Sequence, residues 1–305
     1  MNTDTKNNSR QPARLSAGFG GFFILTGAIL WGTTGTAQAL APAEGQPLVL
    51  GTLRIIIGGL AMLIVALRKE TFLCIFQPLG AVSLAAACSA VYQVSFFSAV
   101  KITGVAAGTI IAIGSAPIFA GILGWIIHKE CVNKRWIIAT LLAIGGCTLL
   151  AGAGGAVQLE TVGVFLALLA GASYALLAAS LKGLLQHRPP LSVLGGVFTL
   201  AAVPLLPLLF FHDLNWIASV RGVSVSLHLG LITGALAYAL FSTGLQVVPV
   251  AAAATITLAE PLTAGLLGIF LLGETVGTMG LLGMALLLSG LLILAIPRKT
   301  HPLRK

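Results

Sequence analysis

The chain contains an internal repeat, because residues 104–152 and 248–296 align at one constant offset of 144 positions. The same offset carries Phe97 onto Phe241, so the register holds across two successive apolar segments without an insertion. A repeat of this length in an apolar chain indicates a membrane domain that is built twice. The residues identical in both copies include the pairs Pro117 and Pro261, Glu130 and Glu274, Gly121 and Gly265, Gly124 and Gly268, and Gly146 and Gly290.

The composition places the chain in a lipid bilayer. Of its 305 residues, 57% are hydrophobic and only 8% are charged, which leaves too few polar residues to cover a soluble protein. The formal net charge of +9 is spread between apolar segments and forms no basic stripe. We therefore expect membrane lipid, and not nucleic acid, to surround this protein.

Ten apolar runs are long enough to cross a bilayer, which takes about 20 residues in a helix. Each half of the chain holds five of them. Because five is odd, we expect the second half to enter the membrane upside down relative to the first, and inverted repeats of this kind build alternating-access transporters. The expected spans are Ser16 to Leu40, Pro47 to Leu67, Ile75 to Val100, Val105 to Ile127, Trp136 to Ala153, Thr161 to Leu184, Leu191 to Phe211, Val225 to Val247, Ala251 to Leu272 and Thr278 to Ile296.

The basic residues predict the orientation of the chain, because Lys and Arg accumulate in cytoplasmic loops. With the N-terminus inside, fourteen of the 17 basic residues fall in cytoplasmic segments, only Lys101 and Arg221 fall in outer loops, and Arg54 lies within the second span. Both termini are therefore expected in the cytoplasm. The first apolar run follows Arg14 and is about 25 residues long, which favours an uncleaved span over a signal peptide.

These patterns predict an all-α integral membrane protein of the inner membrane. The expected organisation is a cytoplasmic tail at 1–15, a first five-helix repeat at 16–153, a second five-helix repeat at 154–296 and a basic cytoplasmic tail at 297–305. The cysteines lie within spans or at their cytoplasmic edges, so we expect neither a disulfide nor a metal site, and no cofactor. They are Cys74, Cys88, Cys131 and Cys147.

Several short motifs point to one family. They are Trp31-Gly32-Thr33 in the first span, Arg54 in the second, Pro117 followed by Glu130, and Glu260-Pro261 followed by Leu272-Gly273-Glu274. This pattern resembles the EamA-type transporters of the drug/metabolite transporter superfamily from about Gly18 to Pro297. The resemblance implies ten helices in two inverted halves around a central cavity that opens alternately to each side. The related small multidrug resistance proteins carry a carboxylate in their first helix, and its absence here argues against drug-for-proton exchange at that position.

Glu260 is one of two ionisable residues expected deep in the membrane, where such groups are costly and usually functional. Its repeat counterpart is Ala116, so the symmetric scaffold does not require it. A carboxyl group deprived of water favours its protonated form, which suits a substrate or proton-coupling site. The alternative is that Glu260 hydrogen-bonds to backbone freed by Pro261, since proline removes one helix donor.

Arg54 is the other deep ionisable residue, and its repeat counterpart is Phe198. A guanidinium in this place would clamp a substrate carboxylate through two hydrogen bonds. Two further interpretations stay open, namely an ion pair with Glu260 and the capping of carbonyls near a helix end.

Polar and aromatic residues at helical spacing are candidates for the lining of a cavity between the halves. The alternative for each of them is a contact between helices, with its polar atom satisfied across the interface. The candidates are Trp31, Thr34 and Gln38 in the first span, Tyr92 and Gln93 in the third, Tyr174 in the sixth and Tyr238 in the eighth.

Other features are expected to be structural. Glu130 and Glu274 stand at span ends in both repeats and suit helix capping or the fixing of a turn. Small residues, as in Gly230-x-x-x-Gly234, let helices approach closely, within a monomer or across a homodimer. Trp136 is expected at the membrane boundary.

Prolines within spans predict kinks that would act as hinges. Pro117 and Pro261 fall in the fourth and ninth spans, and Pro204 and Pro207 in the seventh.

The function expected from these features is secondary transport of a small molecule. Through the family resemblance we expect export of a metabolite, and an amino acid or similar zwitterion would suit one acid and one base in the cavity. The alternative substrate is an organic cation, with Glu260 as counter-ion and aromatic faces around it; Arg54 argues against this if it faces the same cavity. An intramembrane enzyme, a channel or a scaffold is less favoured, because no catalytic pair and no repeated polar ring lie at membrane depth.

Overall fold

The structure, a computed structural model, describes residues 17–68, 75–152, 160–273 and 275–295. Within these ranges all regular secondary structure is helical. Helices are the form in which an apolar chain satisfies its backbone hydrogen bonds internally, as a bilayer requires.

The first half consists of long unbroken helices. They are α1 (Ala17–Ala39), α2 (Pro47–Leu67), α4 (Leu79–Thr103), α5 (Val105–His128) and α6 (Lys134–Gly152). Gly104 ends α4 with a φ of +83°, a left-handed conformation that favours glycine. Pro117 lies inside α5 without interrupting its assignment as one helix.

The second half begins and ends with continuous helices, α7 (Thr161–Leu185) and α14 (Thr278–Ala295), but the elements between them are segmented. The expected seventh span is α8 (Pro190–Ala202), a 3₁₀ turn at Val203–Leu205 and α9 (Leu206–Leu209). The eighth is α10 (Val220–Leu227), a π-helical segment η3 (His228–Leu236) and α11 (Ala237–Leu245). The ninth is α12 (Val250–Ile256) and α13 (Ala259–Leu272).

Two of these interruptions lie at the prolines singled out in the sequence. Pro204 is in the 3₁₀ turn between α8 and α9, and α12 ends shortly before Pro261. The interruption at η3 contains no proline and was not expected.

In the described part of the chain, eight helical stretches are long and apolar enough to cross a membrane by length and composition. They coincide with the expected spans apart from the first and fifth, which correspond to α1 and α6. The protein is therefore a multi-pass helical membrane protein.

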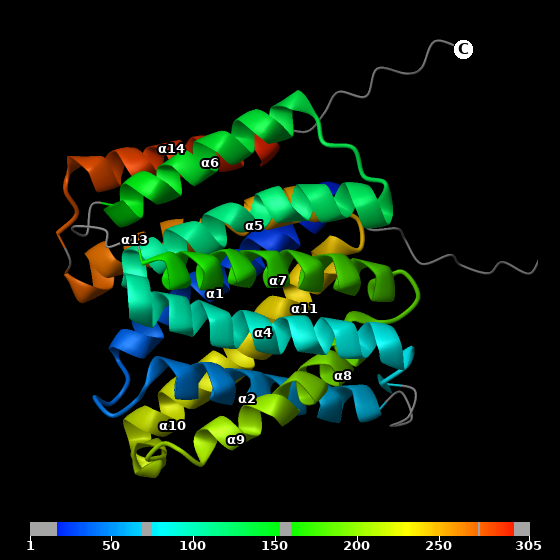
Figure 1. Cartoon of the computed structure of the whole chain (residues 1–305), viewed down its shortest axis with the longest axis vertical. Coiled ribbons are helices and arrows are strands. Elements are labelled where there is room, and N and C mark those ends of the chain that lie inside the picture. The colour runs from blue at the N-terminus through cyan, green and yellow to red at the C-terminus, as the bar shows by residue number, and fades with distance from the viewer. Residues whose placement is uncertain (1–16, 69–74, 153–159, 274, 296–305) are drawn as a thin grey trace, which may run out of the picture.

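The connections gather at two ends of the helix bundle, as Figure 1 shows. The turns after α5, α7 and α11 lie at one end, at the right of the figure, which we call the basic end because it carries Lys129, Lys134, Lys182 and Arg188. The turns after α1, α4, α9 and α13 lie at the opposite end.

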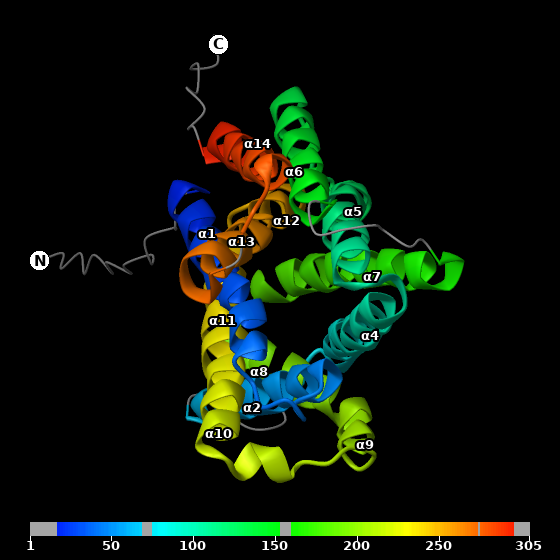
Figure 2. The ribbon, with the colours of Figure 1, turned by 90° about the vertical axis from the view of Figure 1, so that its left-hand side faces the viewer.

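The last helices of the two halves, α6 and α14, lie side by side at one edge of the molecule (Figures 1 and 2). Glycines make this contact close. A Cβ atom on Gly146 would be 2.6 Å from the carbonyl oxygen of Gly283, and one on Gly290 would be 2.6 Å from that of Ala139. In Figure 2, α7 runs across the middle of the molecule.

The hydrophobic core is not uniform along the bundle. One large cluster joins residues of most helices, including Leu181, Leu194 and Leu245, which are fully buried. Smaller separate clusters lie around Leu50 and Ala112 toward the opposite end, and another joins Leu63 and Ile75 at the basic end. The helices thus share one main core with small clusters at both ends.

Candidate functional site

Arg54 of α2 and Trp31 of α1 donate hydrogen bonds to one backbone oxygen. Trp31 Nε1 lies 2.9 Å from the carbonyl oxygen of Thr233, and Arg54 Nη2 lies 3.2 Å from the same atom. The Tyr238 ring supports the guanidinium, with its centroid 5.7 Å from Arg54 Cζ, within the range of a cation–π contact. Arg54 Nε is buried and has no hydrogen-bond partner among the described residues.

The Thr233 carbonyl is available because the helix changes its hydrogen-bond register there. The N–H of Ala237 bonds to the oxygen of Ile232, five residues back, and α11 begins at Ala237 with bonds four residues back. When the spacing between donor and acceptor changes from five residues to four, one carbonyl is left without a backbone donor. This carbonyl is that of Thr233. Its oxygen therefore accepts side-chain donors instead.

Aromatic rings extend from this point in a continuous chain across five helices. The order is Phe198, Tyr238, Trp31, Phe241, Tyr174, Tyr92 and Phe96, with successive centroid distances of 4.6, 4.7, 5.3, 6.4, 5.9 and 5.7 Å. The contacts thus place Trp31, Tyr92, Tyr174 and Tyr238 of the predicted set in one wall.

Glu260 lies at the start of α13, just after the interruption of the ninth span. It is close enough to Arg54, Tyr92, Tyr174 and Tyr238 for electrostatic interaction. Arg54 and Glu260 form no ion pair with each other, and no described residue hydrogen-bonds to the Glu260 carboxylate. Of the structural alternatives drawn from the sequence, the ion pair with Arg54 and the bond of Glu260 to freed backbone are therefore not seen. The third, a bond from Arg54 to a backbone carbonyl, is seen at Thr233.

The residues of this site differ in accessibility. Arg54, Tyr92, Tyr174 and Glu260 are partly accessible, whereas Trp31 and Tyr238 are buried.

The remaining predicted residues are placed differently. Gln93 is 3% exposed and packs against Gly51 of α2, and its Nε2 has no partner in the described residues. Thr34 Oγ1 is likewise buried and unpartnered among them. Gln38 is half-buried one turn further along α1, toward the opposite end, and no described contact joins it to the aromatic wall.

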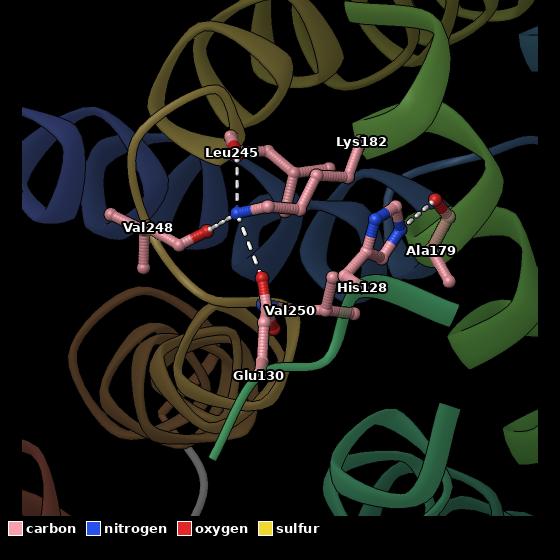
Figure 3. Close-up of polar contacts among 7 residues, drawn as sticks. All are labelled: His128, Glu130, Ala179, Lys182, Leu245, Val248 and Val250. Atoms are coloured by element: carbon pink, nitrogen blue, oxygen red, sulfur yellow. Dashed lines mark hydrogen bonds and ion pairs between the residues drawn. The ribbon is translucent and has the colours of Figure 1, made fainter. Parts of the chain in front are cut away.

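A second polar cluster closes the basic end, and Figure 3 shows it. Lys182 Nζ of α7 lies 3.0 Å from Glu130 Oε1 and donates to the carbonyls of Val248, at 2.5 Å, and Leu245, at 3.3 Å. Glu130 Oε2 accepts a hydrogen bond of 2.7 Å from the N–H of Val250. The two charged side chains are only 12% and 15% exposed. We call this group, with His128, the basic-end cluster.

Glu130 is therefore a helix cap, as expected from the sequence, but the helix that it caps is α12 in the other half of the chain. Its repeat partner Glu274 lies outside the described residues. His128 Nε2 adds a hydrogen bond of 2.8 Å to the carbonyl of Ala179 in α7.

Trp136 makes a contact that the sequence did not indicate. Its Nε1 donates to Thr255 Oγ1 at 3.0 Å, and the hydroxyl of Thr140 lies 2.9 Å from the same atom. Trp136 thus joins α6 to α12 instead of serving only as a boundary residue. Cys88, Cys131 and Cys147 are free thiols, and Cys74 lies outside the described residues.

The fold and the polar interior define a multi-pass membrane protein whose two helical halves enclose a polar and aromatic site. Residues 18–152 and 161–296 each match the EamA-like transporter family, so the chain belongs to that family. It is a membrane transporter and not an enzyme.

Relatives agree with this assignment. The chain is 48% identical over 280 residues to the uncharacterized transporter YwfM of Bacillus subtilis, covering 91% of this chain and 94% of that protein. It is 27% identical over 277 residues to an uncharacterized transporter of Archaeoglobus fulgidus, covering 90% and 96%. A crystal structure with a TM-score of 0.76 and 18% identity covers 90% of this chain and 97% of its own, and shares the fold.

Proposed function

We propose that the protein is a secondary active transporter that exports an amino acid or a similar zwitterion by alternating access. The observation that carries this proposal is the proximity of Arg54 to Glu260 without an ion pair between them. They come from different halves of the chain, have opposite charges, remain partly accessible inside the protein and do not neutralise each other in an ion pair.

The charges of these groups match the two ends of a zwitterion. Arg54 Nε is buried without a partner among the described residues, so a ligand carboxylate that reached it would satisfy this donor. The Glu260 carboxylate, which accepts no hydrogen bond from a described residue, would meet the ammonium group. The partly accessible rings of the aromatic wall, Tyr92 and Tyr174, would hold the rest of a small ligand.

We further propose that all ten helical segments span the inner membrane of a bacterium, including α1 and α6, with both termini in the cytoplasm. The positive-inside rule supports this orientation, because the basic end collects most of the positive charge. On this orientation the basic-end cluster is the cytoplasmic gate.

The described conformation is then the outward-facing one. The Lys182–Glu130 pair, which joins the two halves of the chain at the basic end, supports this assignment. Export would require the gate to open, and Glu260 would carry the proton that couples it to the membrane gradient.

Organic cations are the second candidate class of substrate, favoured by the three tyrosines near Glu260. Arg54 weighs against them, since this cation already occupies the face of Tyr238. The glycine contacts of α6 with α14, and of α2 with η3, are made within one chain, which supports a monomer as the transporting unit.

The test is a thermal-shift screen of the purified protein against amino acids, amines, carboxylates and sugars, followed by flux into proteoliposomes with and without a pH gradient. A ligand that binds the folded state raises its apparent stability by mass action. Stabilisation by zwitterions that is lost in Arg54→Ala supports the proposal. Stabilisation by amines alone that is lost in Glu260→Gln overturns it in favour of cations.

A further inference from the structure

We propose that η3 is a positioning element that sets Arg54 for recognition of a ligand carboxylate, and that Trp31 and Gly234 act with it. This inference rests on the proposed function, because it assumes that Arg54 meets a carboxylate. Specificity for a carboxylate then depends partly on residues that do not themselves contact the ligand's carboxylate.

The Thr233 oxygen fixes the guanidinium in one direction and the Tyr238 ring fixes it in another. A carbonyl oxygen has two lone pairs, so it accepts from Arg54 Nη2 and Trp31 Nε1 together. The Trp31 ring also packs edge-on against Tyr238, with centroids 4.7 Å apart. Trp31 therefore contacts both supports of Arg54.

Glycine brings the positioning element against α2. A Cβ atom on Gly234 would lie 2.9 Å from the carbonyl oxygen of Arg54 and 3.4 Å from its Cγ, and one on Gly58 would lie 2.9 Å from the carbonyl oxygen of Gly230. The absence of side chains at these positions lets the backbone of α2 at Arg54 lie directly against η3. An alanine at position 234 would push this backbone, and the arginine with it, away from η3 without removing any polar group.

Helix α1 is attached to both ends of this element. Thr33 donates its hydroxyl hydrogen to the carbonyl of Leu30, at 2.7 Å, so its oxygen accepts from His228 Nε2 at 2.8 Å. Trp31 holds the other end through Thr233. A shift of α1 is thereby transmitted to the carbonyl that holds Arg54.

A guanidinium that is already held in place binds a carboxylate more tightly, because the arginine side chain loses less conformational entropy on binding. Fixed donors with a defined edge also discriminate a carboxylate from an ester, which accepts more weakly. Loosening of the support should reduce this discrimination more than it reduces binding of the rest of the ligand.

The experiment compares binding of L-alanine, L-leucine and L-phenylalanine with binding of their methyl esters. The proteins are the wild type, Trp31→Phe, Gly234→Ala and Gly145→Ala. Trp31→Phe keeps an aromatic ring but removes the N–H donor. Gly145→Ala is the matched control, because nothing lies within 4 Å of a Cβ atom at that position.

We expect the wild type to bind at least one acid about tenfold more tightly than its ester, which corresponds to about 1.4 kcal/mol. Trp31→Phe and Gly234→Ala should each lower this ratio about threefold or more, because the acid affinity falls further than the ester affinity, while Gly145→Ala keeps the wild-type ratio. An unchanged ratio in both variants, or an equal loss for acid and ester, overturns the inference. Absence of an acid preference in the wild type overturns the proposed function, and this inference with it. Thermal unfolding without ligand identifies a variant that has lost its fold, in which case the other variant decides.

Discussion

Glu130 and Lys182 form an ion pair of 3.0 Å that joins the first half of the chain to the second. Both side chains are also bonded to the turn between α11 and α12, through the carbonyl of Val248 and the N–H of Val250. Three segments are thereby fastened at one point, and no movement that separates them leaves these bonds intact.

We expect Glu130→Gln to open the basic end, because the substitution removes the charge and keeps an oxygen for the Val250 N–H. The measurement is the labelling rate of a single cysteine at Ala178 by an impermeant maleimide added from the cytoplasmic side, in a background without native cysteines. The rate should rise several-fold. Lys129→Gln, an exposed change of charge nearby, is the control and should leave it unchanged. Equal rates in both variants would exclude a gating role for the pair.

Arg54→Ala should abolish recognition of carboxylate ligands and spare amines. Truncation of one partner of a buried charged hydrogen bond costs about 2–5 kcal/mol, so we expect a loss of affinity of about 30-fold or more for acids. Thermal shift and isothermal titration with matched acids and amines measure it. A uniform fall in affinity for both classes would make Arg54 a structural residue.

Glu260→Gln should insert and fold normally but lose the dependence of transport on pH, since an amide does not titrate. The measurement is flux into proteoliposomes between pH 6 and pH 8, with and without a proton gradient. Glu160→Gln changes an exposed acid at the opposite end and serves as the control. Retention of wild-type pH dependence in Glu260→Gln would remove this residue from proton coupling.

Trp136→Phe should lower the stability of the protein by about 1 kcal/mol, because it removes the hydrogen bond to Thr255 but keeps the ring. Trp125→Phe is the matched control, since Trp125 is 61% exposed and has no such bond among the described residues. Thermal unfolding in detergent compares the two. Equal melting temperatures would show that the Thr255 bond contributes nothing measurable.

The sequence predicts the positions of the helices well, because the length and apolarity of a span are local properties. The interruptions near Pro204 and Pro261 were predictable for the same reason, since proline acts on its own helix. The family was also predictable, because its motifs lie at short spacing within the chain.

The site was predictable only in part. Arg54 and Glu260 stand out by charge, but their relation to Thr233 depends on a π-helical segment that no residue pattern announces. The acceptor at Thr233 is a backbone atom, which sequence patterns do not single out; the nearest signal is the pair Gly230 and Gly234, which indicated close packing without naming its partner. Glu130 was recognised as a cap, yet the capped helix is 120 residues away along the chain, and only the tertiary structure identifies it.

The interruptions of α8–α9, α10–α11 and α12–α13 make the two halves mechanically unequal. The helices of the first half are continuous, whereas three of the five spans of the second half are interrupted. Two halves related by a pseudo-two-fold axis need comparable flexibility if each is to adopt the conformation of the other. In this chain the interruptions are concentrated in the second half. We therefore expect the second half to bend between states while the first half moves little internally. The two repeats differ at the site, where the counterparts of Arg54 and Glu260 are Phe198 and Ala116. They thus differ also in the stiffness of the helices that carry the site.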